Sequence, residues 1–233
     1  MHSKVDGHLL VDNRPDVIRA KLRSEPVVVA FWTRILRDFG GNVWPPDFEE
    51  PPLSADEGTI RADLLTGVEL FSIAHEYGHH VLKHGVVTST ENSENAFDQE
   101  HDADVFARII GLLNENQQPR PSQVSASGAA ALLILGALDL VRRANWLLAT
   151  GVDDPPPRKS HPPFKDRIAY IAGADQLAPE QARANLSLRR SNFCEIIEIV
   201  WAEVRPHLPS LHQQGARPND RRPIDPGGWL PLA

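Results

Sequence analysis

The chain has 233 residues, of which 41% are hydrophobic and 24% are charged, an ordinary composition for a globular protein with a sizeable core. Its formal net charge of −7 offers no basic excess to neutralise phosphates, which argues against a nucleic-acid partner. The single cysteine, Cys194, excludes an intrachain disulfide and a cysteine-rich zinc site, and it fits a reducing, cytoplasmic compartment.

The first 60 residues are predicted to form a helical segment and a proline-rich loop. The N-terminal sequence MHSKVDGHLLVDNRPD lacks an uninterrupted apolar core and a small-residue cleavage site, so we expect no signal peptide. Residues 15–39 carry an apolar stripe, and Pro26 within them predicts a break between two helices. Residues 40–58 contain four prolines and three glycines, a pattern typical of a loop.

Five helices are predicted after this loop. A long helix is expected over residues 61–84, ended by a glycine, and a second over residues 93–113 after a polar loop. The remaining predicted helices cover residues 124–149, a segment starting at residue 165, and residues 179–207. We therefore expect a mainly α fold with little or no β-sheet.

The apolar stretch ASGAAALLILGALDLV, residues 126–141, needs to be distinguished from a membrane span. Asp139 interrupts it, Arg142 and Arg143 follow it, and it is shorter than the ~20 residues that a bilayer requires. It is therefore interpreted as a buried core helix, and no transmembrane segment is expected. A peripheral contact with a membrane is left open.

The motif HEYGH, residues 75–79, predicts a metal site. On a helix, His75 and His79 point from the same face, so both imidazoles can reach one ion at ~2.0–2.1 Å. Glu76 lies about 100° around the helix, which places its carboxylate beside the ion. Two histidine ligands with a glutamate as general base to a metal-bound water are the zincin arrangement.

A surface helix that happens to carry several histidines is the alternative interpretation. Phe71, Gly78 and Leu82 fall on the same side as the two histidines, which predicts a buried face where histidines need partners. Gly78 costs ~1 kcal/mol relative to alanine, and it is explained if another segment approaches closely there. His80 and His84 lie on other faces and are interpreted as non-ligands.

The third ligand is expected from DQEHDADVFA, residues 98–107, because a catalytic zinc has three protein ligands and one open position. Glu100 and Asp104 share a helical face with alanines, which suits close packing against the HEYGH helix. Glu100 is the preferred ligand, with His101 and Asp102 as alternatives, and a solvated acidic helix is the competing explanation. Asp104 would orient a ligating histidine or pair with an arginine.

Together, HEYGHHVLKHG and EHDAD make the chain resemble the gluzincins, zinc metallopeptidases whose third ligand is glutamate. The later stretch SHPPFKDRIAYI is similar to the His-Pro and Arg-Ile stretch of HtpX-like and CAAX-prenyl-endopeptidase-like peptidases, at His161 and Arg167. HEYGHH with DADVFA also resembles the compact ImmA/IrrE-like group, which the short spacing between His79 and Glu100 suits.

The resemblance implies a zinc-dependent endopeptidase acting on a protein or peptide. A zincin-like core would occupy residues 61–212, in which the HExxH helix packs on a second ligand-bearing helix, and residues 213–233 would be a disordered tail. One Zn²⁺ per chain would be held by three ligands, and Glu76 would take the proton of a zinc-bound water and pass it to the leaving amine. The expected zinc ligands are His75, His79 and Glu100.

Further roles follow from the position of the remaining residues in the family pattern. His161, by its place in the His-Pro stretch, is the candidate to stabilise the oxyanion, with Tyr170 as a weaker candidate and a loop histidine without a role as the alternative. The resemblance also implies a structural pair between Arg167 and Asp104.

Two other functions stay open. One is a catalytically inactive, metal-bound interaction or regulatory module of the ImmA-like type, and the other is a hydrolase that acts on a different amide. Glu76 argues against the inactive module, because such a protein has no chemical need for that carboxylate.

Overall fold

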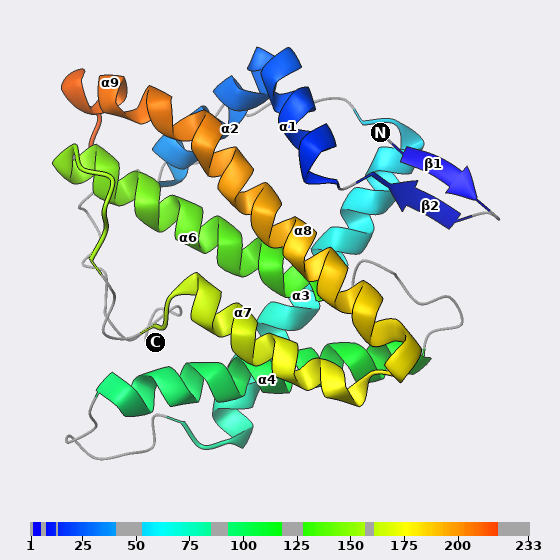
Figure 1. Ribbon diagram of the computed structural model, residues 1–233. Coiled ribbons are helices and arrows are strands. Elements are labelled where there is room, and N and C mark those ends of the chain that lie inside the picture. The colour runs from blue at the N-terminus through cyan, green and yellow to red at the C-terminus, as the bar shows by residue number, and fades with distance from the viewer. Residues whose placement is uncertain are drawn as a thin grey trace.

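The computed structural model describes most of the chain. The described residues are 2–5, 8–12, 14–40, 53–84, 93–117, 128–156 and 161–218. Figure 1 shows them as a packed set of helices with a small two-stranded sheet at one margin. The prediction of a mainly α fold is confirmed.

The chain begins with a β-hairpin that the sequence analysis did not predict. Strand β1 (His2–Val5) pairs antiparallel with β2 (His8–Val11), and His2 lies opposite Val11 in the register. The sequence between the strands is Asp-Gly, the residue pair most typical of two-residue hairpin turns. This Asp-Gly pair is the feature of the sequence that could have predicted the hairpin.

Two helices follow the hairpin, as predicted. They are α1 (Pro15–Ser24) and α2 (Pro26–Gly40). The break falls before Pro26, because a proline ring disfavours helical geometry in the residue that precedes it. Most of the predicted loop after α2 lies outside the described residues.

Helix α3 (Ala55–Val81) begins six residues before the predicted start. A capping box explains the difference. The hydroxyl of Ser54 accepts from the amide of Glu57 at 3.3 Å, and the Glu57 carboxylate accepts from the amide of Ser54 at 2.9 Å. These two bonds satisfy amide groups that a helix start leaves unpaired. Helix α4 (Ser93–Gln117) comes next in the described chain.

The remaining helices complete the core. They are α6 (Ala129–Thr150), α7 (Phe164–Gly173), the 3₁₀ turn η1 (Ala174–Leu177), α8 (Glu180–Val204), the 3₁₀ turn η2 (Arg205–His207) and α9 (Leu208–Gln213). The predicted tail overlaps the end of α9, the described chain ends at residue 218, and the rest of that tail lies outside the described residues.

Helix α6 is the centre of the core and packs against α2, α3, α8 and α9. Five of its leucines are almost fully buried, namely Leu132, Leu135, Leu140, Leu147 and Leu148, which confirms the prediction of a buried core helix. Gly136 allows α8 to approach, because a Cβ there would lie only 2.8 Å from Ile197. No helix within the described residues is long and apolar enough to cross a membrane.

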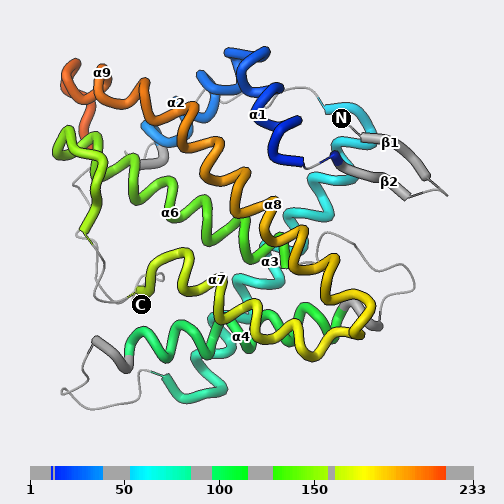
Figure 2. The backbone as a smooth tube through the Cα atoms, viewed as in Figure 1, coloured from blue at the N-terminus to red at the C-terminus, as the bar shows by residue number. Residues whose placement is uncertain are grey.

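Figure 2 shows how α3 crosses the molecule. Its trace starts near the hairpin, passes behind α6, α8 and α7 in this view, and reaches α4 on the far side. Among the described elements, α3 and α4 share the most extensive contact. The HEYGH motif lies in the last third of α3, at this contact.

Candidate metal centre

A close helix contact brings the two predicted ligand helices together. A Cβ on Gly78 would lie 3.1 Å from Phe106 Cδ1 and 3.3 Å from Ala103 Cα, which is tighter than ordinary van der Waals contact. Both neighbours belong to α4. The prediction that another segment approaches Gly78 closely is confirmed, and only a residue without a side chain permits this approach.

Three predicted ligands converge at this contact. The Nε2 atoms of His75 and His79 lie 3.1 Å apart. Glu100 from α4 places Oε1 3.5 Å from His79 Nε2 and Oε2 3.7 Å from His75 Nε2. The ligand atoms of all three residues lie within 4.8 Å of one another. Tetrahedral zinc with bonds of ~2.0–2.1 Å would hold neighbouring ligand atoms ~3.3 Å apart, so the spacing fits.

The structure also separates the alternatives for the third ligand. In the described part of the chain, neither His101 nor Asp102 joins the three-residue cluster. His101 is buried and stacks on Tyr170, with ring centroids 3.7 Å apart and planes inclined by 9°. The ring of Tyr170, the weaker oxyanion candidate, therefore packs on His101.

Asp104 supports His75 from the side away from the cluster. Its Oδ1 lies 3.0 Å from His75 Nδ1, and its side chain has 0% exposure. An ionised carboxylate only accepts, so the proton of His75 belongs on Nδ1. Nε2 of His75 then presents a lone pair to the cluster, which is the form a metal requires.

Arg167 of α7 contacts two acidic residues of α4, Asp104 and Glu100. Its Nε and Nη2 each donate to one oxygen of Asp104 at 2.6 Å, and Nη2 also lies 3.3 Å from Glu100 Oε2. The expected pair between Arg167 and Asp104 is confirmed. This bidentate geometry fixes Asp104 in the orientation that His75 needs.

The electrostatics of the cluster favour a bound cation. Burial, together with the neighbouring His75 and His84, lowers the pKa of His79 to about 4, so its imidazole is neutral near pH 7. Burial also raises the pKa of Glu100, against the opposing influence of Arg167. A buried carboxylate and two imidazole lone pairs that point at one another repel, because all three are acceptors. A bound cation would offset this repulsion.

Asp104 behaves differently from Glu100. Burial by itself would raise the pKa of Asp104, but hydrogen bonds from Arg167 and His75 outweigh that effect and lower the pKa below its ordinary value. Asp104 therefore stays ionised, while Glu100 lacks equivalent support. The donor set of two imidazoles and one carboxylate suits zinc, and the residues present fit that ion.

His84 is the residue whose contact the sequence analysis missed. Among the described residues, His84 does not belong to the three-residue cluster. However, its Nδ1 lies 2.9 Å from Nδ1 of His79. The predicted helix over residues 61–84 placed His84 on another face, but α3 ends at Val81 and His84 lies in the turn that follows. The predicted helix end was therefore wrong, and helical spacing misplaced this residue.

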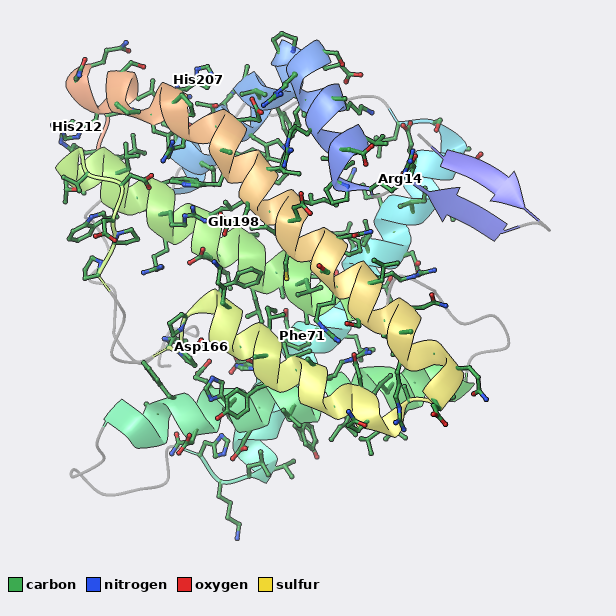
Figure 3. All side chains as sticks on the ribbon, in the orientation of Figure 1. Arg14, Phe71, Asp166, Glu198, His207 and His212 are labelled. Carbon is green, nitrogen blue, oxygen red and sulfur yellow. The ribbon has the colours of Figure 1, made fainter. Side chains whose placement is uncertain are left out.

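The cluster opens into a cleft that also contains Glu76. The cleft has a volume of about 90 Å³, and its walls are the described residues Phe71, Ser72, His75, Glu76, Glu100, Ile134, Leu135, Leu138 and Arg167. Figure 3 labels Phe71, which lies in the middle of the molecule. Glu76 is exposed on its helix, so the carboxylate predicted as general base has access to solvent and to the cleft.

A second cavity lies beside this cleft. It has a volume of about 240 Å³ and includes His161 and Pro162 in its wall, while sharing Leu135, Leu138 and Arg167 with the first cleft. His161 lies just before α7, with Nε2 3.7 Å from Glu100 Oε1. The structure thus brings His161 to the edge of the cluster from a distant part of the sequence.

Comparison with known proteins gave one match. Residues 30–186 match the model of a family described as Peptidase U49, which is about two thirds of the chain. The matched range contains the three-residue cluster, Glu76, His161 and Arg167. No curated protein and no solved structure matches the chain.

Proposed function

The chain belongs to the peptidase U49 family, and we propose that it is a zinc-dependent endopeptidase that hydrolyses peptide bonds in a protein substrate. One zinc ion per chain would be held by His75, His79 and Glu100. The observation that carries this proposal is the convergence of their ligand atoms within 4.8 Å, beside Glu76 in the same cleft. Two histidines with a glutamate form the ligand set of the gluzincins.

The chemistry needs a Lewis acid and a base on the two sides of one water molecule. When bound, zinc lowers the pKa of a coordinated water to about 7 and polarises the substrate carbonyl. Glu76 accepts the proton of the attacking water and passes it to the nitrogen of the leaving amine. Its position in the cleft wall, next to His75, supports this role.

Other residues of the chain would orient the ligands and stabilise charge. Asp104, whose Oδ1 lies 3.0 Å from Nδ1 of His75, would keep that ring in one tautomer, while Arg167 holds Asp104. His161 is proposed to donate to the oxyanion as it forms. Its Nε2 lies 3.7 Å from Glu100 Oε1, which puts the imidazole at the edge of the cluster where the oxyanion would form.

The two neighbouring cavities would bind the substrate. The cleft at Glu76 and the cavity at His161 share the side chains of Leu135 and Leu138. An extended peptide that crosses the cluster would therefore contact Leu138 on α6 with a side chain close to the cleaved bond. The walls here are mainly apolar, and shape and apolar contact would contribute most to binding.

The proposal is tested by zinc content and cleavage together. Purified parent chain is analysed for bound zinc beside Glu100→Ala and Glu76→Gln, and each protein is incubated with a peptide library whose new termini are read by mass spectrometry. We expect one zinc per parent chain. Zinc binding should be greatly weakened in Glu100→Ala, because a ligand is lost. Bound zinc should be retained in Glu76→Gln, and this variant should no longer cleave the peptides.

The outcomes separate the competing functions. Zinc binding without cleavage of any peptide or added protein would favour the inactive regulatory module. Zinc-dependent hydrolysis of a non-peptide amide would favour the other hydrolase. Cleavage that survives in Glu76→Gln, or a parent chain that takes up no zinc at neutral pH, would contradict the proposed mechanism.

A further inference from the structure

The turn that ends α3 returns His84 to the metal cluster. Lys83 has φ of 59°, the left-handed conformation. The amide of Lys83 donates to the carbonyl of His80 at 3.2 Å, and the amide of His84 donates to the carbonyl of His79 at 2.9 Å. These two bonds are those of a Schellman motif, in which the residue after the left-handed one contacts the last turn of the helix.

The usual hydrophobic contact of this motif is here a contact between two histidines. Nδ1 of His79 lies 2.9 Å from Nδ1 of His84, and the ring centroids are 5.0 Å apart with planes inclined by 70°. At this distance one nitrogen donates and the other accepts. The turn therefore sets up a hydrogen bond between the two rings.

The direction of this bond follows from the chemistry of the ligand. Nε2 of His79 faces His75 and Glu100, so it must present a lone pair when a metal is held there. A neutral imidazole carries its single proton on the other nitrogen. Nδ1 of His79 is then the donor, and Nδ1 of His84 is the acceptor.

We propose that His84 is a positioning residue of the metal centre, which sets the tautomer and ring orientation of His79 by accepting a hydrogen bond from its Nδ1. This inference rests on the proposed zinc site. His84 does for His79 what Asp104 does for His75, although its imidazole is a neutral acceptor and Asp104 is a carboxylate. Such partners of metal-ligating histidines affect metal affinity strongly.

The geometry argues against a role for His84 as a fourth ligand. His84 meets the ring of His79 at Nδ1, whereas the cluster lies at Nε2. Among the described residues, the ligand atoms within 4.8 Å of one another come from His75, His79 and Glu100 alone. A position at the ion thus stays open for water and substrate, as catalysis requires.

Zinc affinity in three variants of the full chain provides the first test. His84→Leu removes the acceptor, His84→Asn keeps an oxygen close to the place of Nδ1, and His80→Leu is the matched control. His80 is exposed and stacks on Tyr77. By competition with a chromophoric chelator, His84→Leu should bind zinc about 10- to 100-fold more weakly. His84→Asn should recover most of the affinity, and His80→Leu should match the parent.

The side-chain protons of histidine provide a second readout that does not depend on activity. In zinc-loaded parent chain labelled with nitrogen-15 histidine, the Nδ1 proton of His79 should be protected from exchange with water. In His84→Leu that signal should be lost. A role of His84 in folding alone would not produce a protected proton on His79.

Each outcome supports or overturns the inference. A parent chain that binds no zinc overturns the proposed function and this inference together. A parent chain that binds zinc while His84→Leu binds it equally well overturns this inference alone. If thermal melting of the metal-free protein shows that His84→Leu folds poorly, the test rests on the zinc affinity of His84→Asn and on the exchange protection of the His79 Nδ1 proton in the parent chain. An Asn variant without recovered affinity, or an unprotected proton, then overturns the inference.

Discussion

At the scale of single residues, Asp104 joins helix α4 to Arg167 of α7 and to His75 of α3. It accepts two hydrogen bonds from Arg167 and faces Nδ1 of His75 at 3.0 Å, with no exposed surface of its own. Its face of the helix could be inferred from the sequence, because alanines surround it on the helical wheel. The family resemblance implied Arg167 as its partner, but which histidine it meets depended on the packing of α3 against α4.

Asp104→Asn is predicted to weaken both the metal site and the fold. The amide cannot neutralise Arg167, which is buried beside it, and losing one partner of a buried ion pair costs about 3 kcal/mol or more. His75 also loses a charged acceptor, so zinc affinity should fall about 10- to 100-fold. Urea unfolding and zinc competition measure the two effects.

Asp102→Asn is the matched control for that variant. Asp102 lies on the same helix and is exposed, so its replacement should change the free energy of unfolding by no more than about 0.5 kcal/mol. Equal effects of the two substitutions would show that Asp104 has no special role.

At the scale of secondary-structure elements, the contact between α3 and α4 determines whether the ligands meet. Helix α3 supplies both histidines and α4 supplies the glutamate. The existence of both helices was predictable from their apolar spacing and polar boundaries. The glycine that lets them approach was noticed in the sequence, but only the structure identifies Ala103 and Phe106 as its neighbours.

Gly78→Leu is predicted to separate the two helices. Its Cβ would lie 3.1 Å from Phe106 Cδ1 and 3.3 Å from the backbone at Ala103, and the rest of the side chain has no space. Overpacking of this kind costs about 1–3 kcal/mol. Because the shift moves Glu100 away from the histidines, zinc affinity should fall along with the free energy of unfolding.

Gly58→Ala tests whether that effect is due to the contact. Gly58 lies in the same helix, and a Cβ there would have no atom within 4 Å. Replacement should stabilise the protein by up to ~1 kcal/mol, from helix propensity, without any change in zinc affinity. Zinc affinity that is unaffected by Gly78→Leu would show that the helix contact does not set the ligand geometry.

At the scale of the whole molecule, a buried group of charges ties distant elements together. Asp175 in η1 lies 3.0 Å from Nη2 of Arg108 on α4 and 2.6 Å from Nη1 of Arg190 on α8. Both Arg108 and Asp175 are buried. The three residues connect the ligand-bearing helix α4 to the C-terminal part of the fold, and no sequence pattern indicated them.

Asp175→Ala is predicted to destabilise the whole fold. Two arginines would lose their shared partner, and one of them is almost without exposed surface, so we expect a loss of about 3–5 kcal/mol in the free energy of unfolding. Asp153→Ala is the control, because its pair with Arg205 is largely exposed and worth at most about 1 kcal/mol. Chemical denaturation of both variants measures the difference.

Zinc is predicted to stabilise the whole chain as well as to activate it. A ligand that binds only the folded state at 100 times its dissociation constant adds about 2.7 kcal/mol of stability. A chelator should therefore lower the melting temperature of the parent chain and of Glu76→Gln by a similar amount. Glu100→Ala should melt at the same temperature with and without the chelator, and a shift equal to that of the parent would contradict its role as ligand.

The sequence by itself determined the mainly α fold, the approximate extent of most helices, and His75, His79, Glu76 and Glu100 as candidates for one site. These follow from local rules, since helical periodicity and a four-residue spacing act within one element. The end of α3 was less predictable, because a turn of special backbone geometry follows it.

Tertiary structure decided which groups surround that site. Arg167 and His161 reach it because α7 packs on α4, and His84 reaches it because Lys83 adopts a left-handed conformation. Contacts between elements depend on how whole helices pack, and a single sequence carries no periodic signal for them. The ligands and the pair of Arg167 with Asp104 could therefore be proposed from the sequence, whereas the contacts of Asp104 with His75 and of His84 with His79 could be identified only in the folded chain.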